Sequence, residues 1–310
     1  MQPWNIAHRG GARLQPENTL AAFKNAVACG CDGAELDVQL TLGGEVAVFH
    51  DFHLKPEICR DFTGKWLTPP LPRIKNLTLA ELKRFDIGRA DPGSAYARDR
   101  ADVAWKDGMQ IPSLGEAIDV AKSAAGPFRL FIDLKTCFSN RSVSGAPEAL
   151  AMRTIQVVSA HDFLDHAVFA SFDWQGLVHV KRIEPRAHCW FTTMPQSWFQ
   201  EGKPPPTDDP PAGHALNVLR HWAKEGISPW AAGFDAIRHD GSLLKAIKAA
   251  GGDGWFPFHT DATAEAVAEA HALGLKVGAW TVNDPKEMRR LAKRGVEAIC
   301  TDRPDLFKSE

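Results

Sequence analysis

The chain has 310 residues, of which 44% are hydrophobic and 24% are charged. These values are typical of a soluble globular protein and exclude a disordered, collagen-like or coiled-coil chain. The 36 basic and 38 acidic residues give a net charge of −2, with no long run of like charge, so nucleic acid is not an expected partner. No apolar run approaches the roughly 20 residues that span a bilayer, so we expect no transmembrane segment and a cytoplasmic location.

The six cysteines are too dispersed for a disulfide framework, and none forms the C-x-x-C spacing of zinc and redox sites. Cys29 and Cys31 lie close together, but the glycines around them indicate a helix end that turns into a strand rather than a reactive pair. We therefore expect all six to be reduced thiols.

Short β-rich segments alternate with amphipathic segments along the chain, a pattern typical of βα units around a parallel sheet. Eight strands are predicted, at residues 5–9, 33–38, 129–134, 167–172, 188–191, 254–258, 276–282 and 298–301. The clearest helical patterns lie between them, at residues 20–28, 114–123, 148–159, 262–272 and 285–293. This α/β alternation predicts an eight-stranded (β/α)8 TIM barrel, which we expect to form one domain over residues 1–310.

A hairpin is predicted directly after the second barrel strand. Residues 45–50 form an additional strand candidate, and the Gly43-Gly44 pair before them is a signal for a two-residue hairpin turn. With that turn, the returning strand is antiparallel to the barrel strand, and Asp37 is predicted to lie opposite His50.

Three other segments do not fit the alternation. Residues 51–110 are rich in proline and glycine and weakly helical only around 79–85, which predicts a small insertion over the barrel mouth. Residues 194–213 contain a proline-rich run and predict a surface loop, with a ligand for a partner domain as the less favoured interpretation. Residues 234–237 are a further strand candidate without a place in the barrel.

Polar residues end several predicted barrel strands, and the carboxyl-terminal face of such a barrel is where catalytic groups gather. His8-Arg9-Gly10-Gly11 offers a proton-transfer group, a bidentate oxyanion donor and backbone that can approach a ligand closely. A lone histidine at a strand end is more often structural, so this motif indicates a site only together with others.

Two pairs of charged residues are spaced to point the same way from their strands. Glu35 and Asp37 form the first pair, and Asp133 with Lys135 forms the second, which adds a third carboxylate and a cation. Burial of unpaired carboxylates would cost several kcal/mol, and a divalent cation is the natural compensation, with ion pairs to Arg or Lys as the alternative. The predicted hairpin register brings His50 to the same face.

The combined residue types predict phosphodiester cleavage. Three carboxylates suit a hard cation such as Mg²⁺ or Ca²⁺, whereas zinc would favour nitrogen or sulfur ligands. His8 and His50 then remain free to act as general base and general acid. Arg9 and Lys135 would add positive charge at the point where a phosphodiester could bind.

The order and spacing of the motifs resemble the N-terminal signature of the glycerophosphodiester phosphodiesterases. The matching motifs are His8-Arg9-Gly10-Gly11, Pro16-Glu17-Asn18-Thr19, Gly33-x-Glu35-x-Asp37-Val38 and Val48-Phe49-His50-Asp51. Later landmarks of that family are resembled by Ile111-Pro112-Ser113-Leu114, Trp280-Thr281-Val282-Asn283 and Thr301-Asp302-Arg303-Pro304. The resemblance implies a TIM barrel with a small insertion after the second histidine, and hydrolysis of a glycerophosphodiester to sn-glycerol 3-phosphate and an alcohol in lipid and glycerol metabolism.

The resemblance also implies roles for individual residues. It implies a catalytic acid/base pair: His8 and His50. It implies three ligands of one divalent cation, Mg²⁺ or Ca²⁺: Glu35, Asp37 and Asp133. It implies three residues that bind the phosphate and the glycerol or alcohol of a small-molecule diester: Arg9, Lys135 and Trp280. Glu17 or Asn18 is expected to brace Arg9 or its loop and to take part in the N-terminal cap of the next helix.

Position 133 departs from the family pattern, which usually has glutamate there. The shorter Asp133 predicts either a ligand that binds through water or an ion drawn toward its strand. The Asp133-Leu134-Lys135 segment is also similar to sphingomyelinase D-type phospholipases, so a sphingomyelinase D or lysophospholipase D activity is the alternative. A catalytically silent barrel that binds sugar phosphates is a further alternative, as is a metal-dependent enzyme acting on a non-phosphate substrate.

Overall fold

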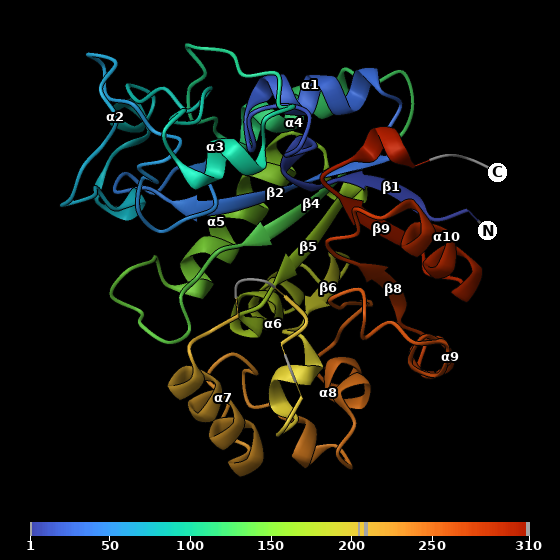
Figure 1. Ribbon diagram of the computed structural model, residues 1–310. Coiled ribbons are helices and arrows are strands. Elements are labelled where there is room, and N and C mark those ends of the chain that lie inside the picture. Colours follow the sequence, from blue (N-terminus) through green and yellow to red (C-terminus); the bar gives the residue numbers. More distant parts are fainter. Residues whose placement is uncertain (1, 204, 208–209, 308–310) are drawn as a thin grey trace.

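The computed structural model describes residues 2–203, 205–207 and 210–307 (Figure 1). Within these residues, eight parallel strands form the barrel: β1 Trp4–Ala7, β2 Gly33–Leu40, β4 Arg129–Leu134, β5 Ala167–Ser171, β6 His188–Thr192, β7 Gly254–Phe256, β8 Lys276–Ala279 and β9 Ala298–Thr301. Their order is β1-β9-β8-β7-β6-β5-β4-β2, and a short parallel pairing of β1 with β2 closes the ring. The predicted TIM barrel is confirmed, with each strand within a few residues of its predicted bounds.

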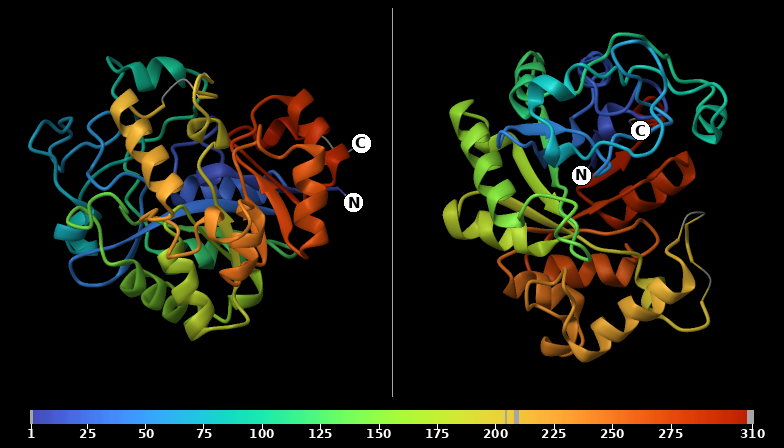
Figure 2. Two further views of the ribbon diagram at one scale, coloured as in Figure 1. Left: turned by 90° about the horizontal axis from the view of Figure 1, so that it is seen from below. Right: turned by 90° about the vertical axis from the view of Figure 1, so that its left-hand side faces the viewer.

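Helices surround the strands on the outside, as the two views of Figure 2 show. The five predicted helices are present: α1 Leu20–Ala28, α4 Leu114–Lys122, α5 Pro147–Ala160, α9 Ala264–Ala272 and α10 Pro285–Arg294. Within the described residues, four further helices were not predicted: α3 Ala95–Asp99, α6 Trp174–Ile183, α7 Gly213–Glu225 and α8 Leu243–Ala249. The last is too short for a clear periodic pattern, and α7 buries only Leu219, so its apolar stripe is narrow.

The barrel interior is filled by apolar side chains near its amino-terminal end. Ile6, Phe131, Trp190 and Phe256 belong to this inner cluster, and the rings of Phe131 and Trp190 meet edge to face at 5.2 Å. Along β4 the inward positions then change from Phe131 to Asp133, because side chains two apart on a strand share a face. Polar side chains therefore line the barrel at its carboxyl-terminal mouth, beyond the apolar inner cluster.

The predicted hairpin is present, but its predicted register is wrong by one residue. The strand β3 (Val46–Val48) pairs antiparallel with β2. The turn contains three residues, 42–44, and ends in a glycine with a φ of 78°, whereas the prediction used a two-residue turn. The additional turn residue places Asp37 opposite Phe49, whose amide donates to the Asp37 carbonyl at 2.9 Å. His50 therefore lies one position beyond its predicted partner.

Two long segments extend from the mouth of the barrel. We call residues 49–113, between β3 and α4, the first excursion; they contain α2 (Leu79–Leu82), α3 (Ala95–Asp99) and a small apolar core of their own. We call residues 193–242, between β6 and α8, the second excursion, which contains α7. In Figure 1 the first lies at the upper left and α7 at the bottom, with the barrel between them.

The first excursion corresponds to the predicted insertion at 51–110, whereas the second was predicted only in part. The predicted loop at 194–213 contains the short 3-10 helix η4 (Gln196–Phe199), and residues 204 and 208–209 of its proline-rich run lie outside the described part. The strand predicted at 234–237 is wrong: these residues lead into the 3-10 helix η5 (Ala236–Arg238).

The six cysteines are free thiols, as predicted. Cys29 is the C-cap of α1 and Cys31 lies two residues before β2, at the expected change from helix to strand. Over the part of the chain that the structure describes, no helix combines the length and the apolar composition needed to cross a membrane.

Candidate active site

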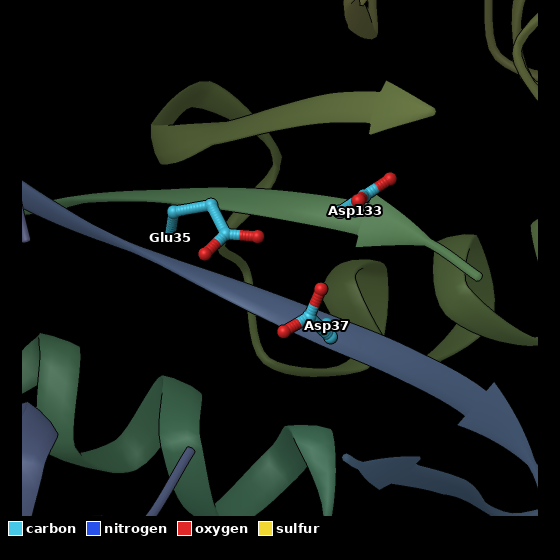
Figure 3. Close-up of side chains that lie close together, drawn as sticks. All are labelled: Glu35, Asp37 and Asp133. Carbon is cyan, nitrogen blue, oxygen red and sulfur yellow. The ribbon is translucent and has the colours of Figure 1, made fainter. Parts of the chain in front are cut away.

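Three buried carboxylates converge at the mouth of the barrel (Figure 3). Glu35 and Asp37 lie on β2, and the strand register sets Asp133 of β4 directly beside Asp37. One oxygen of each carboxylate lies within 4.8 Å of the others, and none of the three residues is more than 7% exposed. The structure thus brings together the three predicted metal ligands, and the shorter Asp133 still reaches the cluster.

Two cations partly compensate this acidic cluster. Lys135 Nζ lies 2.8 Å from Asp133 and 3.1 Å from Asp37, and Arg9 Nε lies 3.2 Å from Asp37. Although burial opposes it, these cations hold the pKa of Asp37 well below its usual range. Burial and the neighbouring Asp37 charge raise the pKa of Glu35 to about 8.

The donor set fits a divalent cation. Oδ1 of Asp133 is buried without a hydrogen-bond partner among the described residues, and the carboxylates outnumber the cations that face them. Hard cations prefer such carboxylate oxygens, and an unsatisfied buried acceptor is costly unless a ligand completes it. Glu35, Asp37 and Asp133 could therefore hold Mg²⁺ or Ca²⁺ at this point.

His8 lies directly after β1 and is oriented by an aspartate from the opposite end of the chain. Its Nδ1 lies 2.6 Å from Oδ1 of Asp302, and its Nε2 lies 3.8 Å from Oε2 of Glu35. Asn283 donates to the other oxygen of Asp302 at 2.8 Å. Burial opposes protonation, but the Asp302 carboxylate raises the pKa of His8 above its usual value. Asp302 thereby turns the Nε2 side of the ring toward the acidic cluster.

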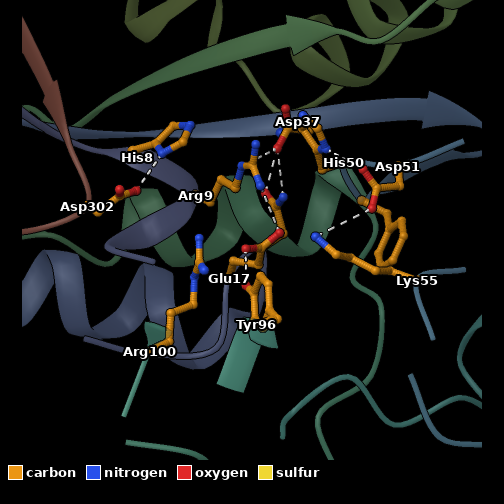
Figure 4. Close-up of polar contacts among 12 residues, drawn as sticks. His8, Arg9, Glu17, Asp37, His50, Asp51, Lys55, Tyr96, Arg100 and Asp302 are labelled. Carbon is orange, nitrogen blue, oxygen red and sulfur yellow. Dashed lines mark hydrogen bonds and ion pairs between the residues drawn. The ribbon is translucent and has the colours of Figure 1, made fainter. Parts of the chain in front are cut away.

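His50 reaches the site although its register differs from the prediction. Gln39 of β2 donates its side-chain amide to the carbonyls of Phe49 at 2.8 Å, His50 at 3.2 Å and Asp51 at 2.8 Å, so the chain turns away from the ladder here. Asp51 also holds Nδ1 of His50 at 2.6 Å. Burial and the Arg9 charge lower the pKa of His50. Figure 4 shows the His50 ring beside Asp37 of the acidic cluster.

Arg9 is fixed from several directions. Its backbone has a left-handed conformation with a φ of 50°, and its Nη1 donates to Oε1 of Glu17 at 2.9 Å. The backbone N–H of Asn18 donates to the Arg9 carbonyl at 3.0 Å, and the side-chain amide of Asn18 donates to Oδ2 of Asp37 at 2.8 Å. The predicted bracing of Arg9 and its loop is confirmed, whereas the cap prediction is wrong, because the N-cap of α1 is Thr19.

Beyond His50 and Asp51, the first excursion contacts this constellation through one tyrosine and one lysine (Figure 4). The Tyr96 hydroxyl donates to Oε2 of Glu17. Lys55 Nζ lies 4.5 Å from the centre of the Tyr96 ring and 3.9 Å from Oδ2 of Asp51. Arg100 lies 4.0 Å from the same ring. The excursion therefore contacts the carboxylates that support both the arginine and the second histidine.

Trp280 follows β8 and forms part of an aromatic wall at the mouth. Its Nε1 donates to the Phe256 carbonyl at 3.0 Å, and its ring meets Phe172 and Phe258 edge to face, each at 5.3 Å. Lys135 Nζ lies 5.7 Å from the centre of the Phe172 ring. The structure thus places the predicted aromatic residue next to the lysine side of the site.

Five residues contribute to the site without having been predicted to: Gln39, Lys55, Tyr96, Asn283 and Asp302. Asn283 and Asp302 belong to two of the later family landmarks, so their polar side chains were available as a signal. No local pattern distinguishes the other three, because each acts across a distance that only the fold determines.

Comparisons with known proteins agree with this geometry. The model of the glycerophosphoryl diester phosphodiesterase family matches residues 8–306. A glycerophosphodiester phosphodiesterase from Caldanaerobacter subterraneus is 28% identical over 300 residues, which cover 97% of this chain and 94% of that relative.

Solved structures show the same similarity. A Silicibacter pomeroyi protein assigned to the glycerophosphoryl diester phosphodiesterases has a TM-score of 0.76 at 30% identity, covering 97% of this chain and 90% of that chain. A phosphodiesterase of Oleispira antarctica, solved with the product sn-glycerol-3-phosphate, has a TM-score of 0.65 at 24% identity, covering 98% and 94% of the two chains. The chain therefore belongs to the glycerophosphoryl diester phosphodiesterase family of enzymes.

Proposed function

We propose that this protein hydrolyses glycerophosphodiesters to sn-glycerol 3-phosphate and an alcohol, with one divalent cation bound by the acidic cluster. The observation that carries the proposal is the meeting, at one barrel mouth, of three buried carboxylates with two histidines that are each held by an aspartate. Family membership supports it, as does the sn-glycerol-3-phosphate found in the Oleispira antarctica relative.

Substrate binding is assigned to the cationic side of the site. Arg9 and Lys135 would bind the phosphate oxygens, since both reach Asp37 and their charges persist near neutral pH. Trp280 would cover an apolar face of the glycerol or alcohol. Mg²⁺ or Ca²⁺, when held by Glu35, Asp37 and Asp133, would supply Lewis-acid stabilisation of the phosphoryl charge.

Proton transfer is assigned to the two histidines. Each ring meets an aspartate through Nδ1 at 2.6 Å, which leaves Nε2 as the nitrogen that faces the reacting atoms. One of His8 and His50 would take the proton from the nucleophile, and the other would give a proton to the departing alcohol oxygen. Water and the neighbouring glycerol hydroxyl are the two candidate nucleophiles, and the second would yield a cyclic phosphate.

The test is the release of sn-glycerol 3-phosphate from a panel of glycerophosphodiesters with Mg²⁺, Ca²⁺ or a chelator. We expect release with at least one cation, loss of release with the chelator, and a decrease of at least about 10²-fold in kcat for His8→Ala. Transient accumulation of a cyclic phosphate would identify the glycerol hydroxyl as nucleophile. Absence of release under every cation, or a fully active His8→Ala protein, would overturn the proposal.

Three broader expectations also stand as proposals. We propose that the chain acts as a single domain over residues 1–310, that it works in the cytoplasm, and that its partner is a small-molecule diester rather than nucleic acid. Six free cysteines support a reducing compartment, and the net charge of −2 gives no electrostatic attraction for nucleic acid.

A further inference from the structure

A cavity of about 80 Å³ lies between the second excursion and the carboxyl ends of β5 and β6. Five aromatic residues contribute to its lining: Phe172, Trp174, Phe199, Trp230 and Phe234. An apolar protein cavity of about 150 Å³ admits benzene, so a cavity of this size suits a group of only a few heavy atoms. A fatty-acyl chain is far too large for it.

Asp235 supplies a buried carboxylate to this aromatic lining. The residue is 4% exposed, and its Oδ1 accepts a hydrogen bond from the Ser228 amide at 3.0 Å. Over the described residues, no cationic side chain forms an ion pair with it. A buried carboxylate without a cation is unfavourable, and a cationic ligand in the cavity would remove that cost.

One hydroxyl of the lining lacks a hydrogen-bond partner among the described residues. Thr192 is 4% exposed, and its Oγ1 forms no hydrogen bond within the described part of the chain. This hydroxyl comes from the end of β6, whereas Asp235 comes from the second excursion. Among the described residues, a carboxylate without a cation and a hydroxyl without a hydrogen-bond partner therefore face the cavity from two separate walls.

The combination of aromatic rings and one carboxylate selects the kind of cation. Aromatic faces attract organic cations, and quaternary ammonium groups are recognised in this way. A primary ammonium carries three N–H donors that each need an acceptor, whereas a quaternary ammonium needs none. Five of the fifteen lining residues are aromatic and one is a carboxylate, a combination that suits the quaternary group.

The cavity adjoins the site through a shared aromatic ring. Phe172 lines the cavity, packs against Trp280, and lies with its ring centre 5.7 Å from Lys135 Nζ. Lys135 is the residue to which phosphate binding is assigned above. The cavity thus begins one aromatic ring away from this lysine.

We infer that this cavity binds the quaternary ammonium group of the departing alcohol, which makes a choline ester the preferred glycerophosphodiester. The inference rests on the proposed function, because it names the head group of the same reaction. Asp235 compensates the ammonium charge, and the aromatic rings surround its methyl groups.

The test compares three substrates that differ only in the head group. They are glycerophosphocholine, its uncharged analogue in which carbon replaces the nitrogen (the 3,3-dimethylbutyl ester), and glycerophosphoethanolamine. We expect kcat/KM to be about tenfold higher for the choline ester than for the uncharged analogue, a factor that cation–π attraction and one carboxylate can supply. The ethanolamine ester should fall below the choline ester.

Two variants and one control locate the effect. Asp235→Asn keeps an acceptor for the Ser228 amide but removes the charge, and it should bring the ratio of choline ester to uncharged analogue close to one. Phe234→Leu keeps an apolar side chain without the ring and should lower the ratio about fivefold. Asp240→Asn removes an exposed carboxylate of the same excursion, which pairs with Lys245, and should leave the ratio unchanged.

Direct binding of choline separates this inference from the proposed function. Choline should change the tryptophan fluorescence of the wild type, since Trp174 and Trp230 line the cavity, and should not do so in Asp235→Asn. The inference would be overturned, while the phosphodiesterase proposal stands, if the wild type has equal kcat/KM for the three substrates. It would also be overturned if Asp235→Asn retains the wild-type ratio of choline ester to uncharged analogue. If no substrate is cleaved but choline still binds through Asp235, the proposed function fails and the cavity site remains.

Discussion

The two excursions approach the same barrel mouth with opposite kinds of side chain. The first places Lys55 and Tyr96 against the carboxylates that support His50 and Arg9, so its contribution is a network of charges and hydrogen bonds. The second places aromatic rings around a cavity, with Asp235 as a buried charge in its lining.

This difference indicates a division of tasks around one site. Under the proposed function, a polar network that holds Arg9 and His50 acts on steps common to every substrate. Under the further inference, the cavity beside the site contacts only the part of the substrate that varies. Changes in the first excursion should therefore alter turnover for every head group, and changes in the second should alter the choice among them.

The largest effect should come from His50→Ala, at the root of the first excursion. Loss of a proton-transfer group should lower kcat by at least about 10²-fold, and equally for the choline ester and its uncharged analogue. Steady-state kinetics with both substrates, at saturating Mg²⁺ or Ca²⁺, measures this.

His53→Ala is the matched control for that variant. His53 lies three residues farther along the same excursion and its Nε2 accepts from Arg73 at 3.1 Å, away from the acidic cluster. It should retain nearly full kcat. Equal losses in the two variants would mean that His50 acts through the structure of the excursion rather than on the substrate.

An intermediate effect should come from Tyr96→Phe, which removes the hydroxyl that Glu17 accepts from. A hydrogen bond to a charged group contributes about 1.5–3 kcal/mol, and we expect part of that energy to appear as a decrease of about tenfold in kcat/KM, for all head groups, through looser placement of Arg9. The Ki of sn-glycerol 3-phosphate as a product inhibitor should rise in parallel.

Tyr96 also provides its own spectroscopic check, because it is the single tyrosine of the chain. Burial and the Glu17 charge raise its pKa well above the usual value, so tyrosinate absorbance should appear only at unusually high pH. Glu17→Gln removes the negative charge and should lower that pKa. Ser94→Ala weakens the N-cap of α3 but keeps the Tyr96 hydroxyl. A tenfold loss of kcat/KM in this variant would mean that Tyr96 has a structural role.

The barrel and the acidic cluster were predictable because their signals are local. The strands at Arg129–Leu134 and Ala298–Thr301 are apolar runs bounded by polar or glycine residues, and their predicted bounds match the observed ones. Glu35 and Asp37 share a face of any strand that contains both, so their convergence needs no knowledge of the loops.

The contacts that hold the site residues in place were not predictable, because they join residues that are far apart in the sequence. Tyr96 meets Glu17 across 79 residues, and nothing near either residue indicates the contact. A single additional turn residue changed the hairpin register, and the Gln39 side-chain amide and Asp51 both contact His50 where it reaches the site. Contacts of this kind arise from tertiary packing, which periodicity and turn signals do not describe.

The smallest effect should be one of stability, at the point where the second excursion is attached to the barrel. Asp261 accepts the backbone amide of Gln196 at 2.9 Å, and burial raises the pKa of this carboxyl to about 6. Because this folded-state pKa exceeds the unfolded value of about 3.9, the group favours the folded state below about pH 4, and this contribution is lost as the pH rises through about 6.

Asp261→Asn keeps an acceptor for Gln196 without the charge, so it should be more stable than the wild type above about pH 6. The gain in the free energy of unfolding should be about 1 kcal/mol, because partial exposure of the carboxyl screens the effect. Urea unfolding at about pH 4 and about pH 7.5 tests this, and a difference that is equal at both pH values would show that the Asp261 charge does not limit how this excursion is held.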